Sequence, residues 1–294
     1  MKTRILGKDL KVSAVGLGCM GMTHASGAPA DVKEMTELVG QALKPYRDKI
    51  VLAIKCGVQH KGDHLEMDSR PETIRKSVEG SLKKLQTDHI DLYYQHRIDP
   101  KVEPEEVAGT MSELIKEGKI LHWGISEVDE EYLRRAHKVC PVTAIQNRLS
   151  MMYRDYEKLF PVLEELQVGF VVFSPLANGF LTACYRDTSQ FEQSPADFRS
   201  SMPQFTKEGV EQNADLLELI QTKAKEKDAT PAQISLAWML AKRPYIVPIP
   251  GSRTLSRLQE NLGAAEIVLT KEEVAQIDDA LDHMTMSQVF GGHR

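Results

Sequence analysis

The sequence VLAIKCGVQH, residues 51–60, runs an apolar segment directly into a lysine and then into a Cys-Gly turn. A short apolar run bounded by turn residues is typical of a strand buried on both faces, as in a parallel sheet covered by helices. Such a strand tolerates a polar side chain mainly where it ends. Lys55 therefore predicts a buried strand that carries a functional group at its carboxyl end.

Similar apolar runs recur along the chain and alternate with amphipathic helical patterns, which predicts parallel strands covered by helices. The segment KTRILGKDLKV, residues 2–12, predicts an opening hairpin. Seven further strands are expected at residues 13–17, 50–55, 90–95, 120–125, 142–146, 169–173 and 245–248. We expect residues 1–294 to form one domain, because α/β barrels of this length are single units.

Three helices have recognisable start signals. Asp31 is a predicted N-cap with Glu34 three residues later, and Thr230 precedes a proline that begins another helix. Pro71 begins the third, whose buried face is expected to contain Ile74, Val78, Leu82 and Leu85. In contrast, residues 175–205 show little periodicity and several turn dipeptides. They predict a long loop, of the kind that often forms a lid.

Composition excludes several classes of function. The net charge is -5 and 27% of residues are charged, with both signs present, so the basic surface that nucleic acids require is not expected. No apolar stretch approaches the roughly 18 residues of a membrane span, and no signal sequence opens the chain, so we expect a cytoplasmic protein. The four cysteines lack CxxC spacing, and His60 and His64 have no third ligand nearby. Neither a disulfide framework nor a metal site is predicted.

Polar residues follow several of the expected strands at the point where each ends. They are Lys55, His96, Ser126, Gln146, Ser174 and the pair Gly251-Ser252. Taken singly, Lys55 could be a side chain that extends into solvent, and His96 a core histidine bonded to the backbone. Barrel active sites form from the carboxyl ends of several strands. The six positions together therefore indicate an active site.

Two segments suggest cofactor phosphates. The first, GLGCMG at residues 16–21, matches the G-x-G-x-x-G dinucleotide motif, but no helix is expected to begin at its third glycine, so we reject that interpretation. The second, IPGSRTLSRLQENLGA at residues 249–264, places Ser252, Arg253 and Arg257 at the start of a helix. This arrangement suits a phosphate monoester. The alternative is that both arginines lie on an ordinary solvated helix.

Taken together, these motifs resemble the aldo-keto reductase family. The matching segments are VSAVGLGCMGM (12–22), SLKKLQTDHIDLYYQHRID (81–99), EGKILHWGISE (117–127), TAIQ (143–146), FSPLANGFLT (173–182) and VPIPGSRTLSRLQENLGA (247–264). They occur in the family's order over nearly the whole chain. The resemblance implies a (β/α)8 TIM-type barrel with an N-terminal hairpin. It also implies hydride transfer from NADPH to an aldehyde or ketone.

The resemblance assigns roles to individual residues. Lys55 and His96 match two members of the family's catalytic tetrad. The implied cofactor-binding residues are Met20, Gly21, Ser126 and Gln146 at the nicotinamide, Ser174, Pro175, Leu176, Gly179 and Leu181 at the pyrophosphate, Gly251, Ser252, Arg253 and Arg257 at the 2′-phosphate, and Glu260 and Asn261 at the adenine. Glu127 stands where many members of the family have asparagine. This sequence therefore departs from the family at one of the contacts to the nicotinamide carboxamide.

The other two tetrad members, an aspartate and a tyrosine, are missing. In the family they come from a segment that resembles F-D-T-A-x-x-Y-G, which this sequence lacks. DVKEMTEL, residues 31–38, resembles the start of one helix, and LVGQALKPYRDK, residues 38–49, resembles the end of a later one. About one strand-helix unit, of the order of 30 residues, is therefore absent. Tyr46 is no substitute, because it lies at the amino end of its strand.

Two other functions remain open on the sequence alone. Since the cofactor residues are present and half the tetrad is not, the chain could be an NADP(H)-binding barrel with little catalysis, serving as a regulatory or interaction subunit. Alternatively, Lys55 could act as a Schiff-base amine in a lyase or aldolase. The expected partner is a small carbonyl compound, and neither its identity nor the oligomeric state can be predicted from these residues.

Overall fold

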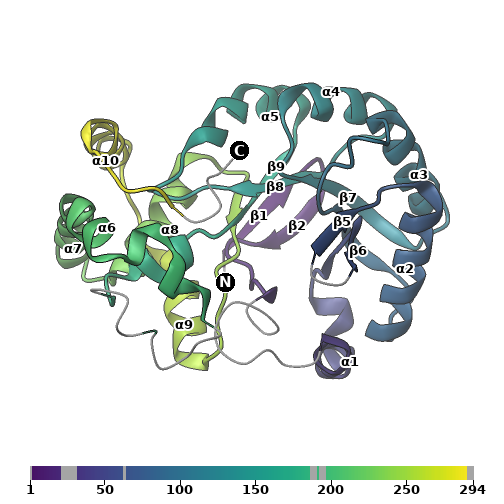
Figure 1. Cartoon of the computed structure of the whole chain (residues 1–294), viewed down its shortest axis with the longest axis horizontal. Helices are drawn as coiled ribbons and strands as arrows, with labels where there is room; N and C mark the ends of the chain where they lie inside the picture. The colour runs from purple at the N-terminus through teal and green to yellow at the C-terminus, as the bar shows by residue number, and fades with distance from the viewer. Residues whose placement is uncertain (1, 21–31, 62–63, 186–190, 192–196, 290–294) are drawn as a thin grey trace.

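The computed structural model describes residues 2–20, 32–61, 64–185, 191 and 197–289. At its centre is a parallel sheet of six strands whose order follows the sequence, with helices along its outer face (Figure 1). From one edge to the other the strands are β10 (Ile246–Pro248), β9 (Gly169–Phe173), β8 (Ala144–Arg148), β7 (Ile120–Ser126), β6 (Ile90–Gln95) and β3 (Ala53–Cys56).

Helices alternate with these strands, as the sequence predicts. They are α1 (Val32–Leu43), α2 (Pro71–Leu85), α3 (Pro104–Lys116), α4 (Glu130–Val139), α5 (Phe160–Leu166), α6 (Lys207–Gln212), α7 (Ala214–Glu226), α8 (Pro231–Lys242), α9 (Leu255–Gly263) and α10 (Lys271–His283). The 3-10 helix η2 (Lys44–Lys49) follows α1, and the 3-10 helix η4 (Ala177–Thr182) follows β9. No helix within the described ranges is long and apolar enough to cross a membrane.

Two of the predicted helix starts are confirmed. Helix α2 begins at Pro71, and its buried residues include Ile74 and Val78, as the helical spacing predicts. Thr230 caps α8 through a reciprocal capping box, in which its hydroxyl accepts from the Gln233 backbone and the Gln233 side chain accepts from the Thr230 N–H. The predicted N-cap Asp31 lies outside the described residues.

The opening hairpin closes the amino end of the sheet interior. It consists of β1 (Thr3–Leu6) and β2 (Leu10–Ser13), and it packs two leucines against residues of the strands. This interior cluster contains Leu6, Leu10, Leu92, Tyr94, Ala144, Val171 and Val247, all buried. A larger core lies between the sheet and its helices. The two cores define an inner and an outer face of the sheet.

The prediction of a strand at residues 13–17 was wrong. The chain leaves β2 at Ser13 and then runs beside β10 without forming a ladder. Gly16 and Gly18 each donate a backbone hydrogen bond, to Pro248 and Pro250 respectively. A barrel strand needs a neighbour on each side, and the described residues supply only one. The sheet therefore has six strands rather than the expected seven.

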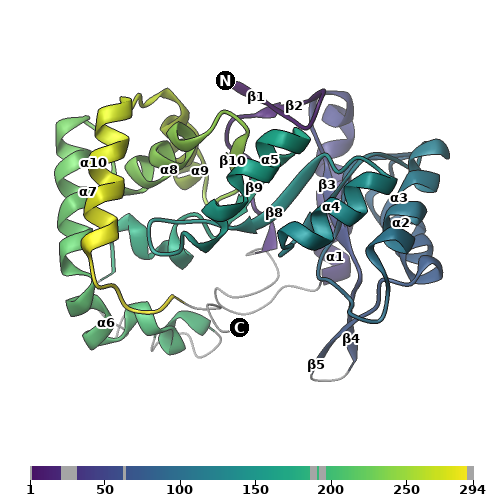
Figure 2. The same ribbon diagram turned by 90° about the horizontal axis from the view of Figure 1, so that it is seen from above.

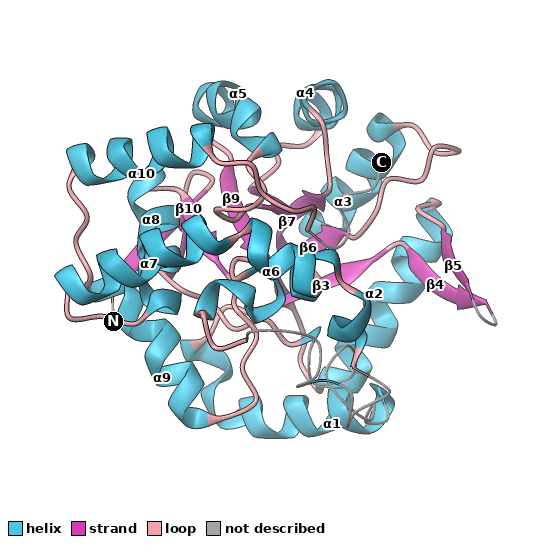
Figure 3. Ribbon diagram, turned by 60° about the vertical axis from the view of Figure 1, so that its left-hand side comes forward, coloured by secondary structure: helices cyan, strands magenta, loops and turns pink. Residues whose placement is uncertain are grey.

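The second departure is a hairpin after β3. The segment after β3, where the sequence predicted no strand, forms β4 (Val58–Lys61) and β5 (His64–Met67). The two strands pair antiparallel from Val58 with Met67 to Lys61 with His64. Figures 2 and 3 show this hairpin extending away from the central sheet. It lies beyond the carboxyl end of β3, next to the site predicted from the sequence.

The junction expected at Leu38 and Val39 is a continuous helix. Helix α1 includes both residues and leads through η2 directly to β3, with no strand between them. Tyr46 lies in η2, 56% exposed, at the amino side of β3 as predicted. In the described part of the chain, β3 pairs only with β6, so the sheet does not close into a complete barrel at this edge.

Candidate active site

Lys55 and His96 lie side by side at the carboxyl ends of adjacent strands. The register of β3 and β6 pairs Lys55 with Tyr94, and the His96 backbone N–H donates to the Cys56 carbonyl oxygen at 2.8 Å. Paired residues of parallel strands point to the same face, and Tyr94 belongs to the interior cluster. The structure thus places Lys55 and, by alternation, His96 on the inner face.

The charge states of these two residues follow from their surroundings. Lys55 keeps an exposed side chain, yet the protein atoms around it desolvate the ammonium and lower its pKa. The nearby Arg97 charge lowers it further, and Cys19 acts in the opposite direction. Burial, together with Lys55 and Arg97, lowers the pKa of His96 to about 4. The imidazole is therefore neutral at pH 7 and can donate one hydrogen bond.

Ser126 and Gln146 lie at the ends of the next two strands. They are register partners in β7 and β8, both are buried, and the Ser126 hydroxyl donates to the Gln146 carbonyl oxygen at 2.8 Å. Arg97 connects this pair to the histidine, because its guanidinium donates to the Ser126 hydroxyl at 3.2 Å and to the His96 carbonyl at 2.7 Å. The four residues form one continuous rim.

The loop that follows β9 has an unusual backbone. Ser174, Ala177, Asn178 and Gly179 all have positive φ, between 47° and 98°. This backbone turns the chain sharply after β9, and the N–H groups of Ala177 and Gly179 donate to the carbonyl oxygens of Ser174 and Leu176. Of the other predicted pyrophosphate residues, Pro175 and Leu181 are buried and Leu176 packs against the core.

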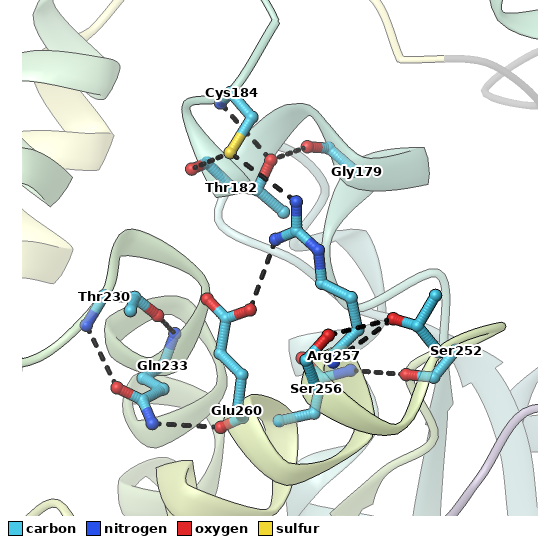
Figure 4. Close-up of polar contacts among 11 residues, drawn as sticks. Gly179, Thr182, Cys184, Thr230, Gln233, Ser252, Ser256, Arg257 and Glu260 are labelled. Atoms are coloured by element: carbon cyan, nitrogen blue, oxygen red, sulfur yellow. Dashed lines mark hydrogen bonds and ion pairs between the residues drawn. The ribbon is translucent and has the colours of Figure 1, made fainter.

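Ser252 and Arg257, two of the residues predicted to bind a phosphate, lie at the start of α9 (Figure 4). The Arg257 guanidinium lies 3.2 Å from the Glu260 carboxylate and 4.0 Å from Cys184 Sγ, so it links α9 to the loop after β9. The buried Asn261 amide donates to the Ser252 hydroxyl at 3.0 Å. Arg253 is exposed in the same segment. Two guanidinium groups therefore face solvent where the sequence predicted a phosphate site.

The N-terminal segment borders the same rim. Gly18 and Gly251 form a parallel bridge, which brings residues 14–20 beside the segment that precedes α9. Met20 is 66% exposed at the end of the described segment. Gly21, the other residue predicted beside the nicotinamide, lies outside the described residues.

Sequence reasoning missed Arg97 and left Glu127 without a role. Arg97 directly follows His96 in the segment QHRID, so its position after a strand could have marked it. Glu127 adopts a left-handed backbone, with φ of 55°, and one of its carboxylate oxygens is buried without a hydrogen-bond partner. An orphaned oxygen beside Ser126 is an acceptor suited to an amide group.

Tyr94, the register partner of Lys55, does not replace the missing acid. Its buried hydroxyl makes no hydrogen bond of normal geometry, and its ring lies against Gly124 on the far side from β3. Burial also raises the pKa of Tyr94 well above its usual value. The tyrosine beside Lys55 in the sheet is therefore not available as a proton donor to a substrate.

A sequence profile of the "Aldo/keto reductase family" matches residues 33–282. The chain belongs to this family. It is 35% identical to "Probable aldo-keto reductase 1" of Glycine max over 317 positions, which cover 97% of this chain and 89% of the relative. It is 36% identical to "Aldo-keto reductase str7" of Strobilurus tenacellus, over 94% of this chain and 91% of that protein. As an aldo/keto reductase, it is an oxidoreductase of small carbonyl compounds.

Solved structures agree with this assignment. The glycerol dehydrogenase AKR11B4 from Gluconobacter oxydans superimposes with a TM-score of 0.85 at 25% identity, covering 99% of this chain and 98% of that one. The holo form of the aldo-keto reductase AKR11C1 from Bacillus halodurans gives 0.76 at 25% identity, covering 100% of this chain and 99% of that one. The family and these structures support the (β/α)8 architecture expected from the sequence, and the described part of this chain forms six of its parallel strands in a sheet that does not close. The alignment with the Glycine max protein, at 317 positions, is longer than this chain of 294 residues, so part of that reductase has no counterpart here.

Proposed function

We propose that this aldo/keto reductase reduces an aldehyde or ketone with NADPH in preference to NADH, and that it acts in the cytoplasm. The observation that carries the proposal is the cluster at the start of α9, where Ser252, Arg253 and Arg257 present a hydroxyl and two guanidinium groups to solvent. A 2′-phosphate distinguishes NADPH from NADH, and guanidinium groups bind phosphate through charge-assisted hydrogen bonds.

The remaining predicted residues fit the rest of the cofactor. The left-handed loop from Ser174 to Gly179 would hold the pyrophosphate, and Ser126 and Gln146 would hold the carboxamide. The orphaned Glu127 oxygen supplies an acceptor for the carboxamide NH2 group. Glu260 and Asn261 would lie at the adenine, and Met20 and Gly21 beside the nicotinamide ring. Bound NADPH would supply the hydride that the carbonyl carbon receives.

The chain's own residues support only part of the acid-base chemistry. In this proposal His96, neutral at pH 7, donates an N–H hydrogen bond that orients and polarises the carbonyl oxygen. The Lys55 ammonium stabilises negative charge on that oxygen. The proton must come from water, because the neutral His96 imidazole can donate a hydrogen bond but does not release its N–H proton at pH 7. Since a positioned general acid contributes about 10²- to 10⁴-fold, reduction should be slower than in a complete reductase by that order.

A second candidate is a reductase-like barrel that binds NADPH with little turnover. It is favoured by a contrast: the residues predicted to bind the 2′-phosphate are all present, whereas the catalytic tetrad is reduced to Lys55 and His96. The two candidates predict the same cofactor affinity and differ only in turnover of a carbonyl substrate.

The test of the cofactor proposal is a fluorescence titration with NADPH and NADH. Losing one charge-assisted phosphate contact costs about 1.5–3 kcal/mol, so Arg257→Ala should weaken NADPH binding by roughly 10- to 150-fold and leave NADH binding unchanged. Arg134→Ala is the matched control, because Arg134 is an exposed arginine of α4 that pairs with Glu130 and Glu165. Equal affinity of the unmodified chain for the two cofactors would contradict the proposal.

A further inference from the structure

The inner face of the sheet is open beside β3. On the neighbouring strands, the inward-facing residues Leu92, Tyr94, Ala144 and Val171 are fully or almost fully buried. In β3 the corresponding residues, Ala53 and Lys55, are exposed. Solvent reaches the Lys55 side chain at this edge, where β3 pairs only with β6 in the described part of the chain.

Neither Lys55 nor His96 is engaged by another side chain. Across the ranges that the structure describes, the Lys55 ammonium has no ion pair or hydrogen bond, and the His96 ring has none. Both lie at the carboxyl rim on the same face. An accessible amine thus lies beside a neutral hydrogen-bond donor, and no carboxylate among the described residues pairs with it.

We propose that Lys55 is an imine-forming amine that condenses with aldehydes entering the open side of the barrel. This activity is separate from hydride transfer, because it requires no cofactor. It is a covalent reaction at the same rim of the sheet where the carbonyl substrate is proposed to bind. It follows from the exposure of Lys55 on β3, the strand at the open edge of the sheet.

The reaction balances without an oxidant or a reductant. The Nζ lone pair forms a bond to the carbonyl carbon, the C=O π electrons move to oxygen, and one Nζ proton passes to that oxygen through water. The His96 N–H donates a hydrogen bond to the oxygen during this step. The second Nζ proton and the new hydroxyl group then leave as water while the C=N bond forms.

The charges around Lys55 support its reactivity at neutral pH. Desolvation and the Arg97 charge lower the pKa of the ammonium, the Cys19 thiol acts weakly in the opposite direction, and His96 is uncharged at pH 7. Each unit by which an amine pKa falls raises its free-amine fraction at pH 7 about tenfold. The free amine is the form that attacks a carbonyl carbon.

The experiment is reductive trapping with the full chain. Propanal and cyanoborohydride are added at pH 7 without NADPH, and the propylated lysines are located and timed by peptide mass spectrometry. Lys49 is the internal control, because it is exposed at the amino side of the same strand. We expect the adduct at Lys55 to form faster than at Lys49 in the same sample. Equal rates at the two lysines would overturn the proposal.

Two variants identify the source of the reactivity. Lys55→Arg should lose the fast adduct and keep the slow one at Lys49. Arg97→Gln should move the pH dependence of trapping at Lys55 to higher pH, because a charge that lowers the lysine pKa is gone; an unchanged profile would contradict the role given to Arg97. Since no cofactor is present, failure of trapping leaves the reductase proposal unaffected, and failure of NADPH binding leaves this one unaffected.

Discussion

The ring of Tyr94 occupies the space above Gly124 on the adjacent strand. A Cβ atom at Gly124 would lie 2.4 Å from Tyr94 Cε1 and 2.4 Å from the Ala144 carbonyl oxygen. Gly124→Ala should therefore destabilise the chain by about 1–3 kcal/mol, as overpacking of a core does, measured by urea unfolding. Gly109→Ala in α3 is the matched control: no atom lies within 4 Å of its added Cβ, and the change should leave stability equal or raise it.

The Tyr94 hydroxyl itself should contribute little to stability. It is buried and makes no hydrogen bond of normal geometry, with the Gln146 side chain as the polar group that acts on it, so Tyr94→Phe should change the free energy of unfolding less than Tyr132→Phe does. Tyr132→Phe is the contrasting variant, because the Tyr132 hydroxyl donates to the buried Gln95 amide at 3.0 Å. That change should cost about 1 kcal/mol. A loss of similar size in both variants would show that Tyr94 does have a partner.

Acid should destabilise the fold through His96. Its pKa is about 4 in the folded chain and 6.5 for an ordinary histidine, so between these values the unfolded chain binds a proton that the folded chain does not. The contribution is complete above pH 6.5 and is lost as pH falls toward 4. Lowering the pH from 6.5 to 4 should therefore reduce the unfolding free energy of the unmodified chain more than that of His96→Gln. A difference between the two chains that is independent of pH would contradict the lowered pKa.

The four cysteines should divide into two pairs. Cys19 and Cys184 are exposed, whereas Cys56 and Cys140 are buried, and burial raises the pKa of the Cys56 thiol to about 12. Two thiols should therefore react with iodoacetamide in the folded chain and the other two only in urea. Peptide mapping identifies which thiols have reacted; early labelling of Cys56 would show that the sheet opens at β3.

Restoring the missing unit should restore catalysis. Insertion between Leu38 and Val39 of a strand-helix segment that contains the F-D-T-A-x-x-Y-G pattern should raise the rate of NADPH-dependent carbonyl reduction by about 10²- to 10⁴-fold, because it supplies the tyrosine acid. NADPH affinity should change little. The control is the same insertion with that tyrosine replaced by phenylalanine, which should close the barrel without the gain in rate.

Much of the sheet could be predicted from local pattern alone. The strands at residues 90–95 and 169–173 have the bounds that their apolar runs indicate, since both are buried in a continuous ladder. Residues 13–17 have an equally good apolar pattern but no second neighbour, and no local rule reports the absence of a partner. The hairpin at residues 58–67 did have a signal, the Gly-Asp pair between two short alternating runs.

The site was predictable to a similar degree. The carboxyl ends of parallel strands meet at one rim of the sheet. The predicted strand bounds therefore placed four residues on this rim: Lys55, His96, Ser126 and Gln146. The hydrogen bonds that Arg97 makes to two of these strands depend on the direction of a long side chain after its strand has ended. That direction is set by tertiary packing, which the sequence pattern does not contain.

The contacts of Gly16 and Gly18 with the far end of the chain bear on the order of folding. Each strand of the central sheet pairs with the strand that precedes or follows it within that sheet along the chain, so the sheet can grow one strand at a time. The two glycine contacts instead join the beginning of the chain to the residues just before α9. Such a closure has a high entropic cost until the intervening sheet is formed. The N-terminal hairpin and the segment after it should therefore be the last part of this chain to fold and the first to detach when it unfolds.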